Sequence, residues 1–278
     1  LNTKRDLLGL SPDMLRKSGL WRILGRLASG PGAPTQSGKQ AMNRPTAVSE
    51  FVRRPGSEAP GQQGLYHPAF EHEACGVGFV VDVKGRKSHQ TVVDALRVLL
   101  NLNHRGARGS EANTGDGAGI LLQMPHRFLE GAAAEVGVTL PPFRQYGVGT
   151  AFLSPDAAHR RGCQRLFEVI AAQEGQDVLG WRIVPTNNAM IGATAKASEP
   201  FMSQVFIRRN PNLADDLDFE RKLFVIRKRA LREIRNSGLR GSQYWYLSSL
   251  SCRTLVYKGM LTSDQLPEYY PDLQDPRL

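Results

Sequence analysis

The residues best suited to chemistry surround Cys75, in the run Glu-His-Glu-Ala-Cys-Gly-Val-Gly-Phe-Val at residues 71–80. The thiol is followed at once by small residues and an apolar run, which predicts a buried strand over residues 76–83. Two glycine-rich turns come next, Asn-His-Arg-Gly-Ala at residues 103–107 and Thr-Gly-Asp-Gly-Ala-Gly at residues 114–119. A thiol in an open backbone is typical of a nucleophile, provided that a neighbouring group accepts its proton.

The proton acceptor for Cys75 is the first chemical question, because a free cysteine has a pKa of about 8.5 and is mostly protonated at pH 7. Six histidines are present, but none has the spacing from Cys75 that marks a cysteine protease. Cleavage between Ala74 and Cys75 would supply another base, a new α-amine with a pKa of about 7.7–8.0. An internal amide nitrogen cannot act in this way, since its lone pair is delocalised. Taken alone, Cys75 also fits a small buried side chain at a strand start.

The composition is that of a globular protein with a basic leader. The 278 residues are 41% apolar and 22% charged, enough for one large domain or two small ones. Of the formal net charge of +10, residues 1–60 contribute ten Lys/Arg against four Asp/Glu. The excess therefore lies mostly in the leader and gives weak support for nucleic-acid binding. No apolar run approaches the roughly 20 residues of a membrane-spanning helix, so we expect neither nucleic acid nor a membrane as a partner.

Residues 1–64 are rich in Gly, Pro, Ser, Gln and Arg and are interpreted as a disordered or leader segment. An amphipathic, arginine-bearing stretch at residues 14–27 also fits an organelle transit peptide. For this segment the sequence favours either a disordered tail or translation upstream of a true start at Met42. The location predicted with it is cytoplasmic. A plastid location is the alternative if residues 1–41 are a transit peptide. Residues 65–74 are interpreted as the end of a propeptide, since the small Ala74 suits a cleavage point.

Apolar stripes at helical spacing, each with a capping residue, predict four helices. They are expected at residues 89–101, 126–136, 155–173 and 217–236. Short β-type runs predict strands at residues 76–83, 120–123, 146–153, 181–184 and 203–208, and a hairpin of residues 244–250 and 254–257. Strands and helices that come in pairs indicate sheets layered under helices, an α+β fold.

Taken together, the three motifs resemble those of the class II glutamine amidotransferases, and in particular the amidotransferase domain of glutamate synthases. The tail agrees: Ser-Ser-Leu-Ser-Cys-Arg-Thr-Leu-Val-Tyr-Lys-Gly-Met-Leu at residues 248–261, then Tyr-Pro-Asp-Leu at residues 270–273. The resemblance implies a four-layer αββα sandwich of the N-terminal-nucleophile hydrolase type, C-terminally truncated. Residues 75–278 would form a partial amidotransferase domain.

The resemblance also implies roles for individual residues. Cys75 would be the catalytic nucleophile and, once its amine is freed, its own base. Arg105 would support the nucleophile, because a guanidinium favours the thiolate. Asp116 and Gly106 would support the loop, Asp116 through Asx-type hydrogen bonds. His104 is interpreted as a loop histidine without a catalytic role.

The same resemblance implies the partners. The substrate would be L-glutamine, and the ammonia would pass to 2-oxoglutarate in the remaining synthase domains of the same polypeptide. FMN and an iron–sulfur cluster are implied for those domains, with a small subunit or ferredoxin as electron donor. We expect no cofactor and no metal in this chain, since no Cys-x-x-Cys pair exists. Because the family's oxyanion-hole and glutamine-binding residues lie further on, the chain alone is expected to be close to inactive.

Two other functions remain open at this level. One is another class II amidotransferase or N-terminal-nucleophile amidase, and the other is a catalytically dead interaction domain. Cys163, within a predicted helix, and Cys252, within the predicted hairpin, are interpreted as structural. The basic residues of the helix at 217–236 are interpreted as a solvated face or one packed on another domain. The glycine-rich turn at residues 115–119 lacks the strand–helix context of a dinucleotide-binding loop.

Overall fold

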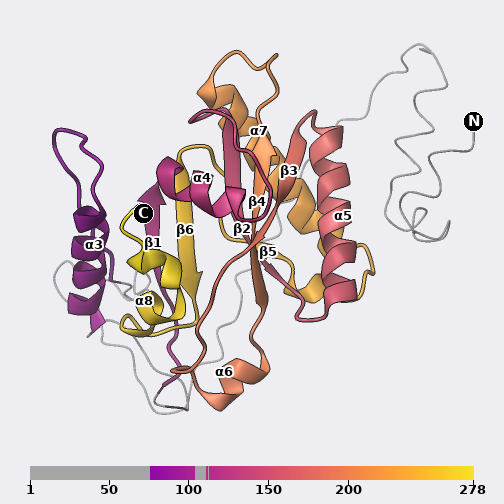
Figure 1. Cartoon of the computed structure of the whole chain (residues 1–278). Coiled ribbons are helices and arrows are strands. Elements are labelled where there is room, and N and C mark those ends of the chain that lie inside the picture. Colours follow the sequence, from indigo (N-terminus) through magenta and orange to yellow (C-terminus); the bar gives the residue numbers. More distant parts are fainter. Residues whose placement is uncertain (1–75, 104–110, 112) are drawn as a thin grey trace, which may run out of the picture. The chain divides into compact units, whose positions relative to one another are not determined.

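The computed structural model describes residues 76–103, 111 and 113–278 (Figure 1). Contacts divide the chain into two units, and these residues all belong to the unit that contains Gly76–Leu278. The elements in chain order are α3 (His89–Asn101), β1 (Ala118–Gln123), α4 (His126–Ala134), β2 (Tyr146–Leu153), α5 (Ala157–Gln173), β3 (Asp177–Ile183), α6 (Ala193–Ala197), β4 (Phe201–Arg208), α7 (Asp216–Arg235), η4 (Ser242–Tyr244), β5 (Tyr246–Leu247), β6 (Thr254–Gly259), α8 (Gln265–Tyr269) and η5 (Pro271–Gln274). The predicted α+β class is confirmed.

An antiparallel sheet of four strands, in the order β3-β4-β2-β5, forms the centre of this unit. Its strongest pairing joins β2 and β4 in unbroken register, from Tyr146 opposite Arg208 to Leu153 opposite Phe201. Nearly every side chain of β2 is buried, so both faces of this sheet are covered. Gly147 of β2 lies against Leu223 of α7, whose Cδ1 would be 2.7 Å from any added Cβ. Glycine at this position therefore lets the helix approach the strand closely.

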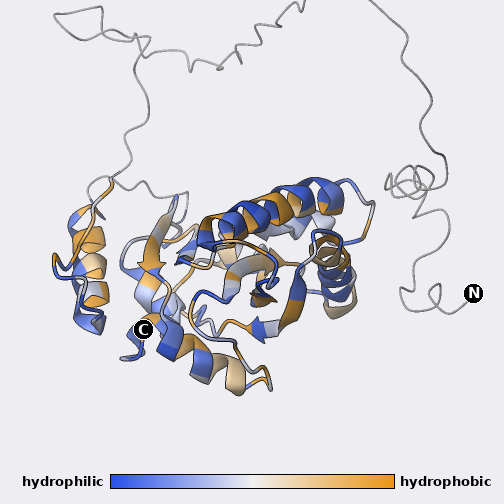
Figure 2. Ribbon diagram, turned by 90° about the horizontal axis from the view of Figure 1, so that it is seen from above, coloured by the Kyte–Doolittle hydropathy of each residue, from blue (hydrophilic) through white to orange (hydrophobic). Residues whose placement is uncertain are grey.

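Helices α5 and α7 cover one face of the four-stranded sheet (Figure 1). Both start at an aspartate N-cap: Asp156 accepts hydrogen bonds from the backbone N–H groups of Ala158 and His159, and Asp215 accepts one from Asp218. Such caps satisfy amides that have no partner within the helix. Figure 2 shows hydrophobic and hydrophilic residues on the same helices, as expected when one face meets a core. The predicted apolar stripe of α7 is fully buried, at Phe219, Leu223, Ile226, Ala230 and Ile234.

The opposite face of this sheet packs against the second sheet, which consists of β1 and β6. These two strands are antiparallel, with Ile120 opposite Tyr257 and Leu122 opposite Leu255. Those four side chains share one core cluster with Tyr146, Val148, Met202 and Phe206 of the four-stranded sheet. Helix α3 contacts β1, and its Val92 is buried in the same cluster. The Ser88 side chain caps α3 by accepting a hydrogen bond from the backbone N–H of Gln90.

The predicted hairpin at residues 244–257 is wrong. Strand β5 pairs with β2 in the four-stranded sheet, whereas β6 pairs with β1 in the other sheet. The intervening residues are held by Glu220 of α7, which accepts hydrogen bonds from the Ser251 hydroxyl at 2.8 Å and the Cys252 amide at 2.7 Å. These contacts fix a crossing between sheets. The two runs alternate as the strands of a hairpin do. An alternating pattern does not specify the partner strand, however, because tertiary contacts determine the pairing.

Candidate active site

The predicted nucleophile and its arginine lie outside the described residues. This applies to Cys75, Arg105 and Gly106, and also to His104. Asp116 is described. It is exposed, in the bend before β1, and its carboxylate forms no hydrogen bond with any other described residue. The proposed Asx-type bond of Asp116 to the described part of the loop is therefore not observed.

The segment that follows Cys75 is not the predicted buried strand. Residues 76–82 form no strand with any described residue, and the side chains of Val77, Phe79 and Val83 are 88%, 88% and 97% exposed. An apolar run becomes a buried strand only where a sheet edge is free to pair with it and a core covers it. Asp82 ends the run in a turn, in which its carbonyl oxygen accepts a hydrogen bond from the amide of Gly85 at 2.9 Å.

Gly78 places this segment against α3. A Cβ on Gly78 would overlap with the Cγ1 atom of Val98 and would lie 3.8 Å from Leu102. Glycine is thus required for the segment to cross the end of α3 at this distance. Gly78 is three residues after Cys75, and Leu102 is three residues before Arg105. Cys75 and Arg105 are therefore each three positions along the chain from a residue at this crossing, Cys75 from Gly78 and Arg105 from Leu102.

The Thr-Gly-Asp-Gly-Ala-Gly turn, residues 114–119, is held by backbone contacts at its glycines. A Cβ on Gly115 would overlap with the backbone of Leu261 and Thr262, and one on Gly119 would lie 2.7 Å from Cβ of Lys258. Gly117 has a φ of 146°, which side-chain-bearing residues rarely adopt. The sequence therefore carries glycines here for close approach, and the turn presents Asp116 to solvent.

Two side chains fasten the chain at the start of this turn. The Glu111 carboxylate accepts hydrogen bonds from the hydroxyls of Thr114, at 3.0 Å, and Thr194, at 2.9 Å. These bonds, with that of Thr194 first, lower the pKa of Glu111 below its ordinary value. The buried amide of Gln265 donates to the carbonyl oxygens of Asn113, at 2.8 Å, and Met190, at 3.1 Å. Sequence reasoning missed Glu111 and Gln265, because the partners that tie them to other segments are 75 to 152 positions away.

A buried polar network joins the two sheets. Arg182 of β3 and Asp272 of η5 form a two-pronged ion pair, with N–O distances of 2.8 and 2.7 Å, and both are buried. Arg182 also donates to Gln204, which donates to the Tyr257 hydroxyl, and Tyr257 donates to Asp272 at 2.8 Å. Burial would lower the pKa of Arg182, but its bonds to Asp272 raise it overall. Burial, followed by the Asp272 charge, raises the pKa of Tyr257 well above its ordinary value.

The two described cysteines are poor nucleophiles. Cys163 of α5 is 1% exposed, and Cys252, in the crossing between sheets, is fully buried. Burial raises the pKa of Cys163 to about 11. Burial, followed by the hydrogen bond and charge of Glu220, raises that of Cys252 to about 12. Both thiols are therefore protonated at neutral pH, and only the thiolate attacks. Their assignment as structural residues agrees with the geometry, although Cys252 is not in a hairpin.

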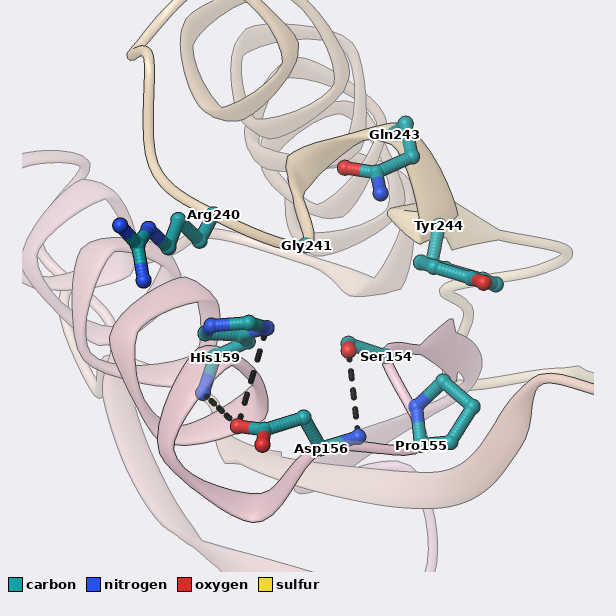
Figure 3. A pocket seen from close by; sticks show the side chains of 8 residues that line it. All are labelled: Ser154, Pro155, Asp156, His159, Arg240, Gly241, Gln243 and Tyr244. Atoms are coloured by element: carbon teal, nitrogen blue, oxygen red, sulfur yellow. Dashed lines mark hydrogen bonds and ion pairs between the residues drawn. The ribbon is translucent and has the colours of Figure 1, made fainter.

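An open pocket of about 540 Å³ lies at the start of α5, and none of the predicted site residues is among those that line it. In it, the Ser154 hydroxyl accepts a hydrogen bond from the Asp156 amide at 3.2 Å, and His159 lies 3.7 Å from Asp156. Figure 3 shows both contacts, and no hydrogen bond joins Ser154 to His159 among these described side chains. Serine, histidine and aspartate thus do not form a catalytic relay here. The lining residues are Ser154, Pro155, Asp156, His159, Arg240, Gly241, Gln243 and Tyr244.

Three of the basic residues of α7 form contacts within the unit. Arg229 pairs with Glu174 of the α5 end at 2.6 Å and with Glu233 at 3.0 Å. Arg227 and Arg235 donate to the backbone carbonyls of Leu247 and Trp245. Among the described residues, no group of three His, Cys, Asp or Glu side chains has the arrangement of a metal site. Within the same residues, no helix has the length and apolarity needed to cross a membrane.

Comparison with known proteins decides the family. The sequence matches the family described as glutamine amidotransferases class-II over residues 75–278, beginning at the predicted nucleophile. The chain belongs to this family. The predicted resemblance to this family is confirmed.

Individual relatives narrow the resemblance to glutamate synthases. The chain is 45% identical over 219 residues to the glutamate synthase [NADPH] large chain of Bacillus subtilis, covering 79% of this chain and 14% of that protein. It is 39% identical over 225 residues to the glutamate synthase [NADH] of Saccharomyces cerevisiae, covering 77% and 10%. It is 38% identical over 209 residues to ferredoxin-dependent glutamate synthase 2, chloroplastic, of Arabidopsis thaliana, covering 74% and 12%. The matched region thus spans 10 to 14% of the length of these relatives.

Proposed function

We propose that this class II amidotransferase domain hydrolyses L-glutamine and supplies ammonia to a glutamate synthase, with Cys75 as its nucleophile. The observation that carries the proposal is the family match starting at Cys75. The two described thiols add support, because burial keeps both protonated. Loss of the residues before Cys75 would free its α-amine, the base that the thiol needs.

In the proposed reaction the α-amine takes the thiol proton, directly or through a water, and the thiolate attacks the side-chain amide carbon of glutamine. A carbon–sulfur bond forms, and the carbon–nitrogen bond then breaks as ammonia leaves with the proton returned by the amine. Water hydrolyses the resulting glutamyl thioester, which gives glutamate and restores the thiol. Each step balances with glutamine and water alone.

Within this scheme Arg105 supports the thiolate, and Gly106 and Asp116 shape the loop beside it. The contact of Gly78 with Val98 and Leu102 supports this grouping. The stacking of α5 and α7, the four-stranded sheet, the β1–β6 sheet and α3 supports the finer assignment as a four-layer αββα sandwich of the N-terminal-nucleophile type.

The rest of the proposed enzyme follows from its relatives. Ammonia would pass to 2-oxoglutarate in other domains, where FMN and an iron–sulfur cluster would bind. The electron donor would be a small subunit or ferredoxin, since relatives named for NADPH, NADH and ferredoxin all match. A cytoplasmic location is proposed, with a plastid as the alternative if residues 1–41 target the protein.

Mass spectrometry of the full-length protein made in its host tests the proposal. We expect a mature chain that begins at Cys75, and a glutamine-analogue diazoketone that attaches to this residue and abolishes glutaminase activity. Cys75→Ala should remove activity and labelling, whereas the matched variant Cys163→Ala should retain both. Folded full-length protein with an intact Ala74–Cys75 bond and no labelling would instead indicate a catalytically dead interaction domain.

A further inference from the structure

Glu111 connects two segments that are distant in sequence at an exposed edge of the domain. It lies six residues after Arg105 and five before Asp116. Its carboxylate accepts a hydrogen bond from the Thr194 hydroxyl, 83 residues away, at 2.9 Å, and longer ones from the Thr194 amide at 3.3 and 3.4 Å. The Thr114 hydroxyl donates to its second oxygen at 3.0 Å. One carboxylate thus holds both the start of the turn at residues 114–119 and the start of α6.

The site around this carboxylate is shaped for it. A Cβ on Gly192, two residues before Thr194, would overlap with the Oε2 atom of Glu111 and would lie 2.7 Å from the Thr114 hydroxyl. Gln265 makes a second tie between the same segments, from Asn113 to Met190. The side chain of Gln265 is 3% exposed, and its own oxygen accepts from the Thr262 amide at 3.0 Å.

These contacts have the character of local positioning. Thr194 is exposed, and Glu111 and Thr114 are only partly buried, so the bonds between them bury little apolar surface. Contacts of this kind contribute little to global stability but determine how far a local segment departs from one conformation. The segment that they fix is the turn carrying Asp116.

We propose that Glu111 is a positioning residue for glutamine hydrolysis, holding the turn at residues 114–119 in one place by its bonds to Thr114 and Thr194. This inference rests on the proposed function. Placement of groups around a reacting centre matters steeply, since a misplacement of about 1 Å can cost roughly 100-fold in rate. The carboxylate form is the one that can accept all of these bonds, because both of its oxygens are acceptors.

A graded series of variants in the full-length protein tests the role of Glu111. We expect Glu111→Ala to lower the kcat of glutaminase, and the rate at which the diazoketone labels Cys75, by about 10- to 100-fold. Glu111→Gln should lose less, because one oxygen remains to accept from Thr194. Thr194→Val should also lose less, because its amide still donates. The double variant Glu111→Ala/Thr194→Val should be no worse than Glu111→Ala, since the two changes remove one shared interaction.

Glu199→Ala is the matched control. Glu199 lies between β3 and β4, as Thr194 does, and accepts hydrogen bonds from Asn188 and Tyr269. It does not contact the turn at residues 114–119, so the kcat of Glu199→Ala should stay near that of the wild type. Equal kcat in Glu111→Ala, Thr194→Val and Glu199→Ala, in a preparation whose wild type is active, would overturn the positioning role alone. A wild type without glutaminase activity or labelling would instead overturn the proposed function, and this inference with it. If Glu111→Ala fails to fold, Thr194→Val decides.

Discussion

Arg182 and Asp272 are oppositely charged side chains, 90 residues apart, that meet where the two sheets join. Both are almost completely buried, so neither charge is well solvated by water. Their pairing and the hydrogen bonds of Gln204 and Tyr257 compensate for the lost hydration. Removing one partner of such a pair leaves an uncompensated charge, which costs more than the pair itself contributes.

We therefore expect Asp272→Leu or Arg182→Met to lower the free energy of unfolding by about 3–5 kcal/mol. The double variant Arg182→Met/Asp272→Leu should recover a large part of this loss, because no unpaired charge remains. Urea unfolding followed by circular dichroism measures all three variants. Losses that simply add in the double variant would show that the two side chains do not compensate each other.

At the scale of elements, a second prediction concerns Gly115, near the start of the turn at residues 114–119. Gly115→Ala should destabilise the protein and lower glutaminase activity, because the new Cβ would overlap with the backbone of Leu261 and Thr262. Gly162→Ala is the matched control. Gly162 lies within α5, and its Cβ would meet only Leu239 at 3.8 Å, so alanine should be neutral or stabilising by up to about 1 kcal/mol. Thermal unfolding and activity of both variants give the comparison, and equal behaviour would contradict it.

The helices could be predicted from the sequence because their signals are local. Residues 89–101 and the end of α5 at Gln173 were predicted as observed, and α7 differs by one residue at each end. The helix predicted from residue 155 begins at Ala157 instead, because Asp156 is its N-cap. Caps and apolar stripes depend on neighbours within a few positions.

Strand pairing and the buried polar network could not be predicted in the same way. The runs at 244–250 and 254–257 resembled a hairpin, yet their partners are β2 and β1. The apolar run at 76–83 has the composition of a strand but no described partner. For the site, glycines marked the close approaches of the turn, but no local pattern connects Glu111 with Thr194 or Arg182 with Asp272.

At the scale of the whole molecule, carboxylates with lowered pKa values make stability depend on pH. A carboxylate with a lowered pKa stabilises the fold above its unfolded pKa, about 3.9 for Asp and 4.3 for Glu. This contribution is lost as the pH falls through the lower folded value. Hydrogen bonds from side chains lower three of these pKa values: Arg86 acts on Asp82, Thr194 on Glu111, and Arg277 on Asp275. Backbone amides lower two more, since His159 donates to Asp156 and Asp218 donates to Asp215. Burial would raise the pKa of Glu174, but Arg229 and Lys222 lower it overall.

We expect the urea midpoint of the full-length protein to fall as the pH is lowered from about 5 to 3, the range in which these groups take up protons. Replacing the two helix caps, Asp156→Asn and Asp215→Asn, should make this dependence shallower, because two of the titrating groups are gone. Urea unfolding at a series of pH values measures both proteins. A midpoint that rises on acidification across this range would contradict the prediction.

The pairing of β1 with β6 also determines when the second sheet can be completed during synthesis. Ala118 pairs with Gly259, roughly 140 residues later, and ribosomes add about 5–20 residues per second. The strand that pairs with Ile120 and Leu122 is therefore synthesised roughly 7 to 28 seconds after them. Through that interval the edge of β1 that β6 later occupies is unpaired, and an unpaired strand edge can pair with another polypeptide.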